Sequence, residues 1–404
     1  MEMKKLLLMM AVTTMAIPSM AQQQLKSGLS LADMDQSARP GDDFFTYACG
    51  GWMKANPLPA AYSRYGSFDR LAENNTKRIN GILKELQENS YAEGTVERKL
   101  SDLYKMAVDT DRREKDGLSP VQPILKRLEA AKTTSQLFAI QKEMMPAGAP
   151  MFYGAGIGAD EMNATQNILG VNQGGLTLGQ KDYYLENDPA TTKIREAYKL
   201  HIVKMFRLFG FKTGAAQKKM QNVMKIEMAL AKVSRSNTQL RDPKANYNKM
   251  TLQEFQSKYP HLQLEQLMNA KGIDSKYLQT LVVGQPEFMA GAEKVIAGLS
   301  APAYRDWMEW RIINGAANLL NDEAAQASFD FYGKVMAGRK ENHPLWRRAT
   351  SQVEGVMGEA LGKIYTEKYF PASSKKRMTT LVENLRIALG ERIAAQTWMD
   401  DSTK

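Results

Sequence analysis

Histidine and cysteine are scarce in this chain of 404 residues, which contains three His and one Cys. Two His one turn apart on a helix usually bring two imidazoles to one zinc ion. Here His201, His261 and His343 are far apart in sequence, and none lies in a HExxH or HxxxH spacing. We therefore expect all three to be structural or solvated. A lone Cys49 excludes internal disulfides, and we expect it either to be buried as a small apolar group or to pair with a thiol outside this chain.

Other catalytic signatures are also missing. There is no GxSxG nucleophile elbow, and Cys49 has no nearby His to activate it. The Gly-Gly pairs at 50–51 and 174–175 lack the Lys-Ser/Thr that a phosphate-binding loop requires. Carboxylates are plentiful, but no acid/base pair stands out. The sequence thus carries no complete catalytic site, and we predict no metal ligands and no catalytic residues within it.

Long blocks of one charge are absent, although the net charge is +10. Lys and Arg are mixed with Glu and Asp along helical segments, and the basic runs are short: Arg112–Arg113, Lys218–Lys219, Arg347–Arg348 and Lys375–Arg377. We interpret them as solvated helix faces and predict no nucleic-acid partner. A protein that binds anionic polymers is the disfavoured alternative, because its charges would be concentrated.

The only marked apolar run lies at the N-terminus. Lys4 and Lys5 precede apolar residues 6–12, and the small residues Ser19 and Ala21 follow the break at Pro18. This pattern predicts a signal peptide over residues 1–21, and therefore an exported protein that is periplasmic or extracellular, with association with the cell surface as an open alternative. The run is too short for a stable membrane span, and no later segment is long and apolar enough.

The remainder reads as mainly α. Residues 22–40 are polar and predict a loose arm, whereas 41–66 are rich in aromatics without helical or strand spacing, which suggests a segment packed against something larger. From residue 67 onward, apolar residues recur at helical spacing. The one convincing strand signal is a short β-hairpin near 151–172.

One helix is expected over 349–369, where Val353, Met357 and Leu361 belong to an apolar stripe. Gly355, Gly358 and Gly362 lie on the same helix, and we expect them to permit close approach of a neighbouring helix. A last helix near 374–397 carries apolar residues on one face, namely Met378, Leu381, Leu385, Leu389 and Ile393.

Several segments, in order, resemble the neprilysin and endothelin-converting-enzyme family of zinc metallopeptidases, in its bacterial, PepO-like form. They span residues 40–404 and comprise 40–52 (PGDDFFTYACGGW), 63–69 (SRYGSFD), 173–178 with 182–185, 226–231 with 241–248, 358–365 (GEALGKIY) and Trp398 with Met399. The resemblance implies a multi-helix lid-type domain over 67–404, which restricts access of large substrates to the active site.

The resemblance also implies a zinc cofactor, held on a C-terminal domain by HExxH and a downstream Glu. That domain is absent from this sequence, so we expect this chain alone to bind no zinc and to be inactive. Its expected partners are peptide substrates and the missing catalytic domain, against which residues 22–66 would pack. We interpret the whole as the substrate-gating N-terminal part of a secreted zinc metalloendopeptidase. The alternative is a stand-alone module that binds peptides or a partner without catalysis.

One site residue follows from the resemblance. Arg64 matches a family Arg that binds the C-terminal carboxylate of peptide substrates, a task that suits the planar guanidinium fork. A structural salt bridge is the alternative role for Arg64. The family's second Arg falls at Ala72, which puts a strong preference for a free carboxylate in doubt. Cys49 matches a Cys that pairs with the catalytic domain in eukaryotic members, but a neighbouring family Cys is replaced by Gly41, as in a disulfide-poor bacterial member.

Overall fold

The structure, a computed structural model, describes residues 30–404. The expected signal peptide, and the part of the expected arm before residue 30, lie outside these residues. The described chain forms two compact units, one ending at Pro59 and the other comprising Ala60–Lys404. None of the helices in residues 30–404 is both long enough and apolar enough to cross a membrane.

The first unit contains a 3₁₀ turn, Leu31–Asp33, and helix α1, Phe44–Ala55. The aromatic segment is therefore helical over Phe44–Ala55, although its sequence shows no helical spacing. The side chain of Asp43 caps the helix by accepting a hydrogen bond from the Thr46 N–H at 2.9 Å. Gly51 lets the helix approach the 3₁₀ turn, because a Cβ there would lie 2.4 Å from the Ala32 carbonyl oxygen. Two glycines in the middle of α1 lower its intrinsic propensity, which hid it in the sequence.

Cys49 lies on α1 as a half-buried free thiol. This is less burial than a small apolar core residue would have. The thiol has no disulfide partner among the described residues.

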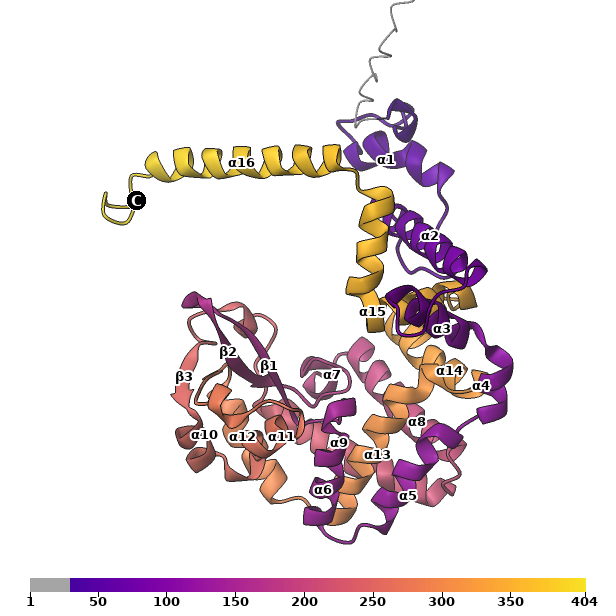
Figure 1. Cartoon of the computed structure of the whole chain (residues 1–404), viewed down its shortest axis with the longest axis vertical. Helices are drawn as coiled ribbons and strands as arrows, with labels where there is room; N and C mark the ends of the chain where they lie inside the picture. The colour runs from indigo at the N-terminus through magenta and orange to yellow at the C-terminus, as the bar shows by residue number, and fades with distance from the viewer. Residues whose placement is uncertain (1–29) are drawn as a thin grey trace, which may run out of the picture. The chain divides into compact units, whose positions relative to one another are not determined.

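In the second unit, α2 (Ser67–Glu88), α3 (Val96–Val108) and α15 (Leu345–Tyr369) pack around one apolar cluster (Figure 1). A buried amide joins the three helices. The Asn80 Nδ2 donates to the Tyr104 hydroxyl at 2.8 Å and to the Thr350 hydroxyl at 3.1 Å. Residues that are far apart in sequence thereby hold the second half of α2 against α3 and α15.

Helices α8 (Pro189–Leu208), α9 (Thr213–Val233), α13 (Ala301–Ala316) and α14 (Asp322–Ser328) surround a second cluster. A π-helix, Phe329–Met336, continues α14. Trp310 is fully buried there and donates its indole N–H to the Tyr198 hydroxyl at 2.9 Å. Figure 1 shows α8, α9 and α13 between the β-sheet and the group of α2, α3 and α15.

The sheet has four strands in the order β1–β2–β4–β3. β1 (Tyr153–Asp160) and β2 (Asn163–Gln173) form the expected antiparallel hairpin, with Tyr153 opposite Gln173. β4 (Thr280–Val283) pairs parallel to β2 and antiparallel to β3 (Asn248–Thr251). The sequence did not reveal β3 and β4, because four residues are too few for a periodic signal and their partners are distant in sequence.

The remaining helices are α4 (Thr110–Asp116), α5 (Gln122–Ala130), α6 (Thr134–Met144), α7 (Asp182–Leu185), α10 (Leu252–Lys258), α11 (Leu264–Ala270), α12 (Pro286–Ala297) and α16 (Ala372–Ala394). Helices α6 and α10–α13 pack with the sheet around the largest apolar cluster. The mainly α fold with a β-hairpin near 151–172 is thus confirmed, with two additional strands.

One expectation about α15 was wrong. No neighbouring atom lies within 4 Å of where a Cβ of Gly355, Gly358 or Gly362 would be, so these glycines do not serve close helix approach. Instead, the helix is kinked at Met357, which has non-helical φ −131° and ψ 33°. The flanking glycines lower helix propensity at the kink.

The basic runs at 112–113, 218–219 and 347–348 are also not simply solvated faces. Lys219 is buried between two carboxylates, the Arg113 side chain is only 11% exposed, and Arg347 and Arg348 are half-buried. These basic side chains meet specific partners or line cavities. Helical periodicity in the sequence does not distinguish such positions from solvent-exposed ones.

Candidate functional site

The loop at 60–66 carries Arg64 and leads directly into α2. The Ala60 carbonyl oxygen accepts two backbone hydrogen bonds, from the Lys340 N–H at 2.9 Å and the Glu341 N–H at 3.1 Å. At the other end, the Gly66 N–H donates to the Asp69 Oδ2 at 2.9 Å, which caps α2. The loop is therefore fixed at both ends.

Tyr62 anchors the middle of the loop. Its ring lies 5.0 Å from the Tyr65 ring and 5.3 Å from the His343 ring, both edge-to-face. The Arg347 guanidinium donates to the Tyr62 hydroxyl and lies 5.2 Å from the centre of its ring. This cation–π contact and the hydrogen bond place Tyr62 between the loop and the start of α15.

Tyr65 turns toward α2. Its hydroxyl donates to the Glu73 Oε2 at 3.0 Å, and burial together with Glu73 raises the pKa of Tyr65 above its ordinary value. The two tyrosines are thus half-buried and bonded, whereas Arg64 between them is exposed. The sequence Tyr-Ser-Arg-Tyr places two anchoring rings on either side of one exposed guanidinium.

No hydrogen bond or ion pair to another residue in 30–404 engages Arg64. The structural salt bridge that was the alternative role for Arg64 has thus no counterpart in the described chain. A solvated guanidinium on a fixed loop can pair both oxygens of an incoming carboxylate.

Ala72 is exposed on α2 and supplies no second cation. Sequence reasoning overlooked Arg70, which lies in the first turn of α2, close enough for its positive charge to act on Tyr65. Because Arg70 is in the first turn of the helix that follows the loop, it lies at the end of α2 next to the loop. Its short distance in sequence from Arg64 would therefore have indicated it.

The three histidines do not come together. His201 is buried on α8 and stacks on Phe331 at 5.0 Å, and burial lowers its pKa to about 4. His261 pairs with Glu293, and His343 packs against Tyr62. Within residues 30–404, no group of three or more His, Cys, Asp or Glu side chains could hold a metal ion. The described residues therefore do not fit a zinc ion.

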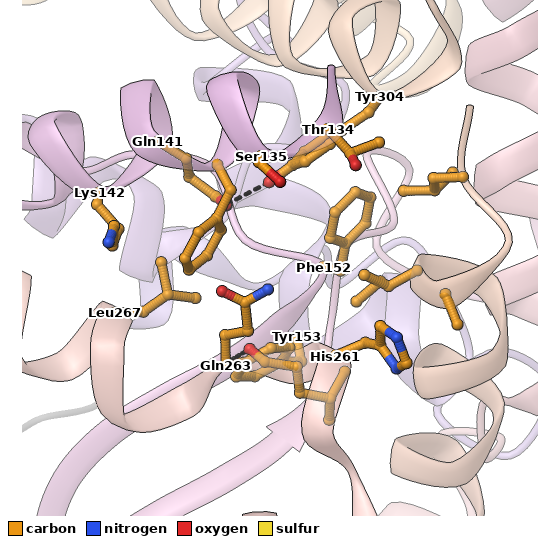
Figure 2. Close-up of a pocket in the computed structure, with 15 residues that line it drawn as sticks. Thr134, Ser135, Gln141, Lys142, Phe152, Tyr153, His261, Gln263, Leu267 and Tyr304 are labelled. Atoms are coloured by element: carbon orange, nitrogen blue, oxygen red, sulfur yellow. Dashed lines mark hydrogen bonds between the residues drawn. The ribbon is translucent and has the colours of Figure 1, made fainter. Parts of the chain in front are cut away.

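A cavity of about 470 Å³ lies between α6, the start of β1 and the turn at 260–263 (Figure 2). Gln141 accepts a hydrogen bond from the Tyr304 hydroxyl on its wall, and the amide of Gln263 points into its centre. Gln263 adopts a left-handed backbone with φ 49°. His261 is the only histidine among the lining residues, and no carboxylate lines the cavity, so the arrangement offers binding groups but no acid/base pair.

A model of the N-terminal region of Peptidase family M13 matches residues 40–404. The chain belongs to peptidase family M13. Among its M13 relatives, endothelin-converting enzyme 1 of Bos taurus is 28% identical over 393 residues, which is 93% of this chain and 50% of the relative. The Homo sapiens enzyme is 28% identical over 390 residues, with 93% and 49% covered. The chain spans about half the length of these relatives.

Solved structures agree with the M13 assignment. Zinc metalloprotease ZMP1 of Mycobacterium tuberculosis, solved with an inhibitor, superposes with a TM-score of 0.86 at 27% identity over 93% of this chain and 57% of that one. PepO from Lactobacillus rhamnosis gives a TM-score of 0.78 at 19% identity, over 91% of this chain and 57% of that one, a likeness of fold. The resemblance to the neprilysin and endothelin-converting-enzyme family is thus confirmed.

Proposed function

We propose that this M13 chain forms the helical, substrate-gating part of a zinc metalloendopeptidase that cleaves peptides. Endothelin-converting enzyme 1 and the zinc metalloprotease ZMP1, which it resembles, support this proposal. The described residues do not fit zinc, so zinc ligands and the water-activating group would come from a catalytic domain outside these 404 residues. When bound there, zinc would polarise the scissile carbonyl.

The observation that carries the proposal is the geometry of the loop at 60–66. Tyr62 and Tyr65 fix the backbone on either side of Arg64, while the Arg64 guanidinium stays exposed and unpaired among the described residues. A cation held on a fixed loop binds with less loss of conformational freedom than one on a free chain. We assign Arg64 the role of binding the C-terminal carboxylate of peptides.

Each unit exposes apolar side chains that suit contact with a catalytic domain. In the first, Phe44 and Phe45 on α1 are 67% and 65% exposed. In the second, Phe68 at the start of α2 is 85% exposed, and α16 has no buried residue although it carries the expected apolar face. Exposed apolar faces of this kind mark protein interfaces. We propose that 22–66 packs on the catalytic domain and that 67–404 forms the lid.

Peptide binding tests the role of Arg64 without catalysis. Two labelled peptides that differ only in a free or an amidated C-terminus are titrated with the chain, and binding is followed by fluorescence polarisation. We expect the free acid to bind about tenfold more tightly, as one charge-assisted hydrogen-bonded pair provides. Arg64→Gln should abolish the difference, whereas Arg98→Gln, which removes an exposed pair with Asp102 on α3, should preserve it. Equal binding of both peptides by the unsubstituted chain would contradict the assignment.

Activity separates the peptidase part from a stand-alone binding module. We expect the 404-residue chain to bind no stoichiometric zinc by elemental analysis and to leave the peptides intact. Adding a zinc-loaded catalytic domain of an M13 relative should produce a complex and change its cleavage of long relative to short peptides. Tight peptide binding with no complex formation would instead favour the module. We also propose that the protein is exported, from the signal-peptide pattern at 1–21, which mass spectrometry of the mature N-terminus would test.

A further inference from the structure

A second basic site lies behind the loop, in a cavity of about 350 Å³. The π-helix Phe329–Met336, the segment that follows it and the first two turns of α15 line this cavity. Four of the lining residues are basic types: Arg339, His343, Arg347 and Arg348. We call these four residues the arginine cleft. Arg64 is not among the lining residues, so the arginine cleft is distinct from the proposed peptide-carboxylate site.

No carboxylate lines the arginine cleft, as judged from the described residues. The two acidic side chains whose charges act on the arginine cleft from outside already have partners of their own. Asp322 pairs with Arg113 at 2.6 Å, and Glu73 accepts the Tyr65 hydroxyl at 3.0 Å. Within 30–404, Arg339, Arg347 and Arg348 form no ion pair. Three guanidinium charges thus share one cavity without an opposite charge in it.

Two donors in the cleft are buried without a hydrogen-bond partner among the described residues, the Nε of Arg339 and the Nε of Arg348. The other contacts of the cleft are to neutral groups. Arg339 lies 5.3 Å from the Phe329 ring centre, and Arg347 donates to the Tyr62 hydroxyl. A buried donor without a partner costs free energy, so the two arginines are held in the cleft without full compensation by the described residues.

The positive charge of the arginine cleft also acts on His343. Burial, and then Arg347 and Arg339, lower the pKa of His343 to about 4. Burial and the neighbouring Arg113 lower the pKa of Arg348. His343 is therefore neutral at neutral pH, and its ring reports the positive potential of the cleft. An anion in the cleft would oppose the effect of the two guanidinium groups on His343.

We propose that the arginine cleft binds an oxyanion, a carboxylate or a phosphate, through Arg339, Arg347 and Arg348. Each guanidinium offers a planar fork of donors that matches the oxygens of either group. The cavity is roomy enough for such a group with bound water. The cleft also lies against a π-helix, a conformation that frequently occurs at functional sites. This inference does not depend on peptidase activity.

The test uses the whole chain and two probes: inorganic phosphate, and N-acetylglutamic acid α-amide, whose only charge is a side-chain carboxylate. NMR titration of the three His rings gives the first measurement. We expect a saturating probe to raise the pKa of His343 from about 4 toward its ordinary value. The pKa of His201, which is buried on α8, should not change. The probe that binds more tightly identifies the source of the oxyanion.

Variants give the second measurement, by calorimetry at constant ionic strength. Arg347→Gln and Arg348→Gln should each weaken probe binding about tenfold, the effect of losing one charge-assisted partner. The matched control, Arg386→Gln, removes an exposed charge on α16 and should leave the affinity unchanged. The proposal is overturned if neither probe shifts His343, if sodium chloride shifts it equally, or if Arg386→Gln weakens binding as much as the cleft variants. If a cleft variant fails to fold, the His343 titration of the unsubstituted chain decides.

Discussion

Replacing Lys219 should strongly destabilise the second unit. Its Nζ lies 2.8 Å from the Asp306 Oδ1 and 2.5 Å from the Glu309 Oε2, and these acidic side chains are only 5% and 0% exposed. Lys219→Met keeps the apolar stem but leaves two buried carboxylates on one turn of α13. The remaining cation, Arg305, is 3.9 and 4.0 Å from them. Breaking a buried ion pair from one side costs about 3–5 kcal/mol, which is the loss we expect.

The loss should also depend on pH. Burial raises the pKa of Glu309 to about 7, even though Lys219 acts to lower it. Because this folded-state pKa lies above the value in the unfolded chain, the stabilisation from protonating Glu309 is present at low pH and is lost as pH rises through about 7. Without Lys219 the pKa rises further, and the proton neutralises one of the two carboxylates. We therefore expect Lys219→Met to be less costly near about pH 5 than near about pH 8.

Urea unfolding followed by tryptophan fluorescence measures this, because Trp307 and Trp310 lie on the same helix as the two carboxylates. Lys199→Met is the control, since Lys199 forms an exposed pair with Glu196 at 2.7 Å. It should cost less than about 1 kcal/mol at either pH. The reasoning is refuted if Lys219→Met is as mild as Lys199→Met, or if its cost is the same at both pH values.

Three further substitutions test other parts of the fold by the same unfolding assay. Gly175→Ala should cost about 2 kcal/mol or more, because Gly175 has φ +77° and a Cβ would lie 2.6 Å from a neighbouring carbonyl oxygen; no loss would contradict this conformation. Asn80→Ala should cost about 1–3 kcal/mol of unfolding free energy, since it leaves the buried hydroxyls of Tyr104 and Thr350 without their shared donor. In this variant, limited proteolysis should cleave first within the group of α2, α3 and α15. Trp307→Ala should cost about 3–5 kcal/mol through the cavity it leaves, and a smaller effect would mean that the core refills.

Helices with a strong apolar stripe could be predicted from the sequence. Residues 302–320 carry Trp307, Trp310 and Ile313 at helical spacing, and all three are fully buried on α13. The hairpin near 151–172 could also be predicted, because the alternation of apolar and polar residues and a polar turn are local signals. Helix α1 was missed because Gly50 and Gly51 interrupt its pattern, although the cap at Asp43 was available as a signal.

The site was only partly predictable. The family motif singled out Arg64, and its exposure and lack of a partner among the described residues agree with a binding role, which peptide titration has yet to test. Arg347 and Arg348 looked like a solvated pair, since one helical turn of sequence contains no information about what packs on it. Arg347 instead donates a hydrogen bond to Tyr62, 285 positions away, and both arginines line a cavity with residues of the π-helix.

The sequence by itself determined the family, the mainly helical fold and the presence of an arginine in the Ser-Arg-Tyr-Gly motif, because these depend on local patterns and on ordered motifs. Only the tertiary structure decided which charges are compensated. Lys219 meets two carboxylates from another helix, whereas the arginines of the cleft meet no carboxylate in residues 30–404. Both are basic pairs in the sequence. The difference arises from long-range contacts, since the energy of a charge depends on burial and on the groups that folding brings to it.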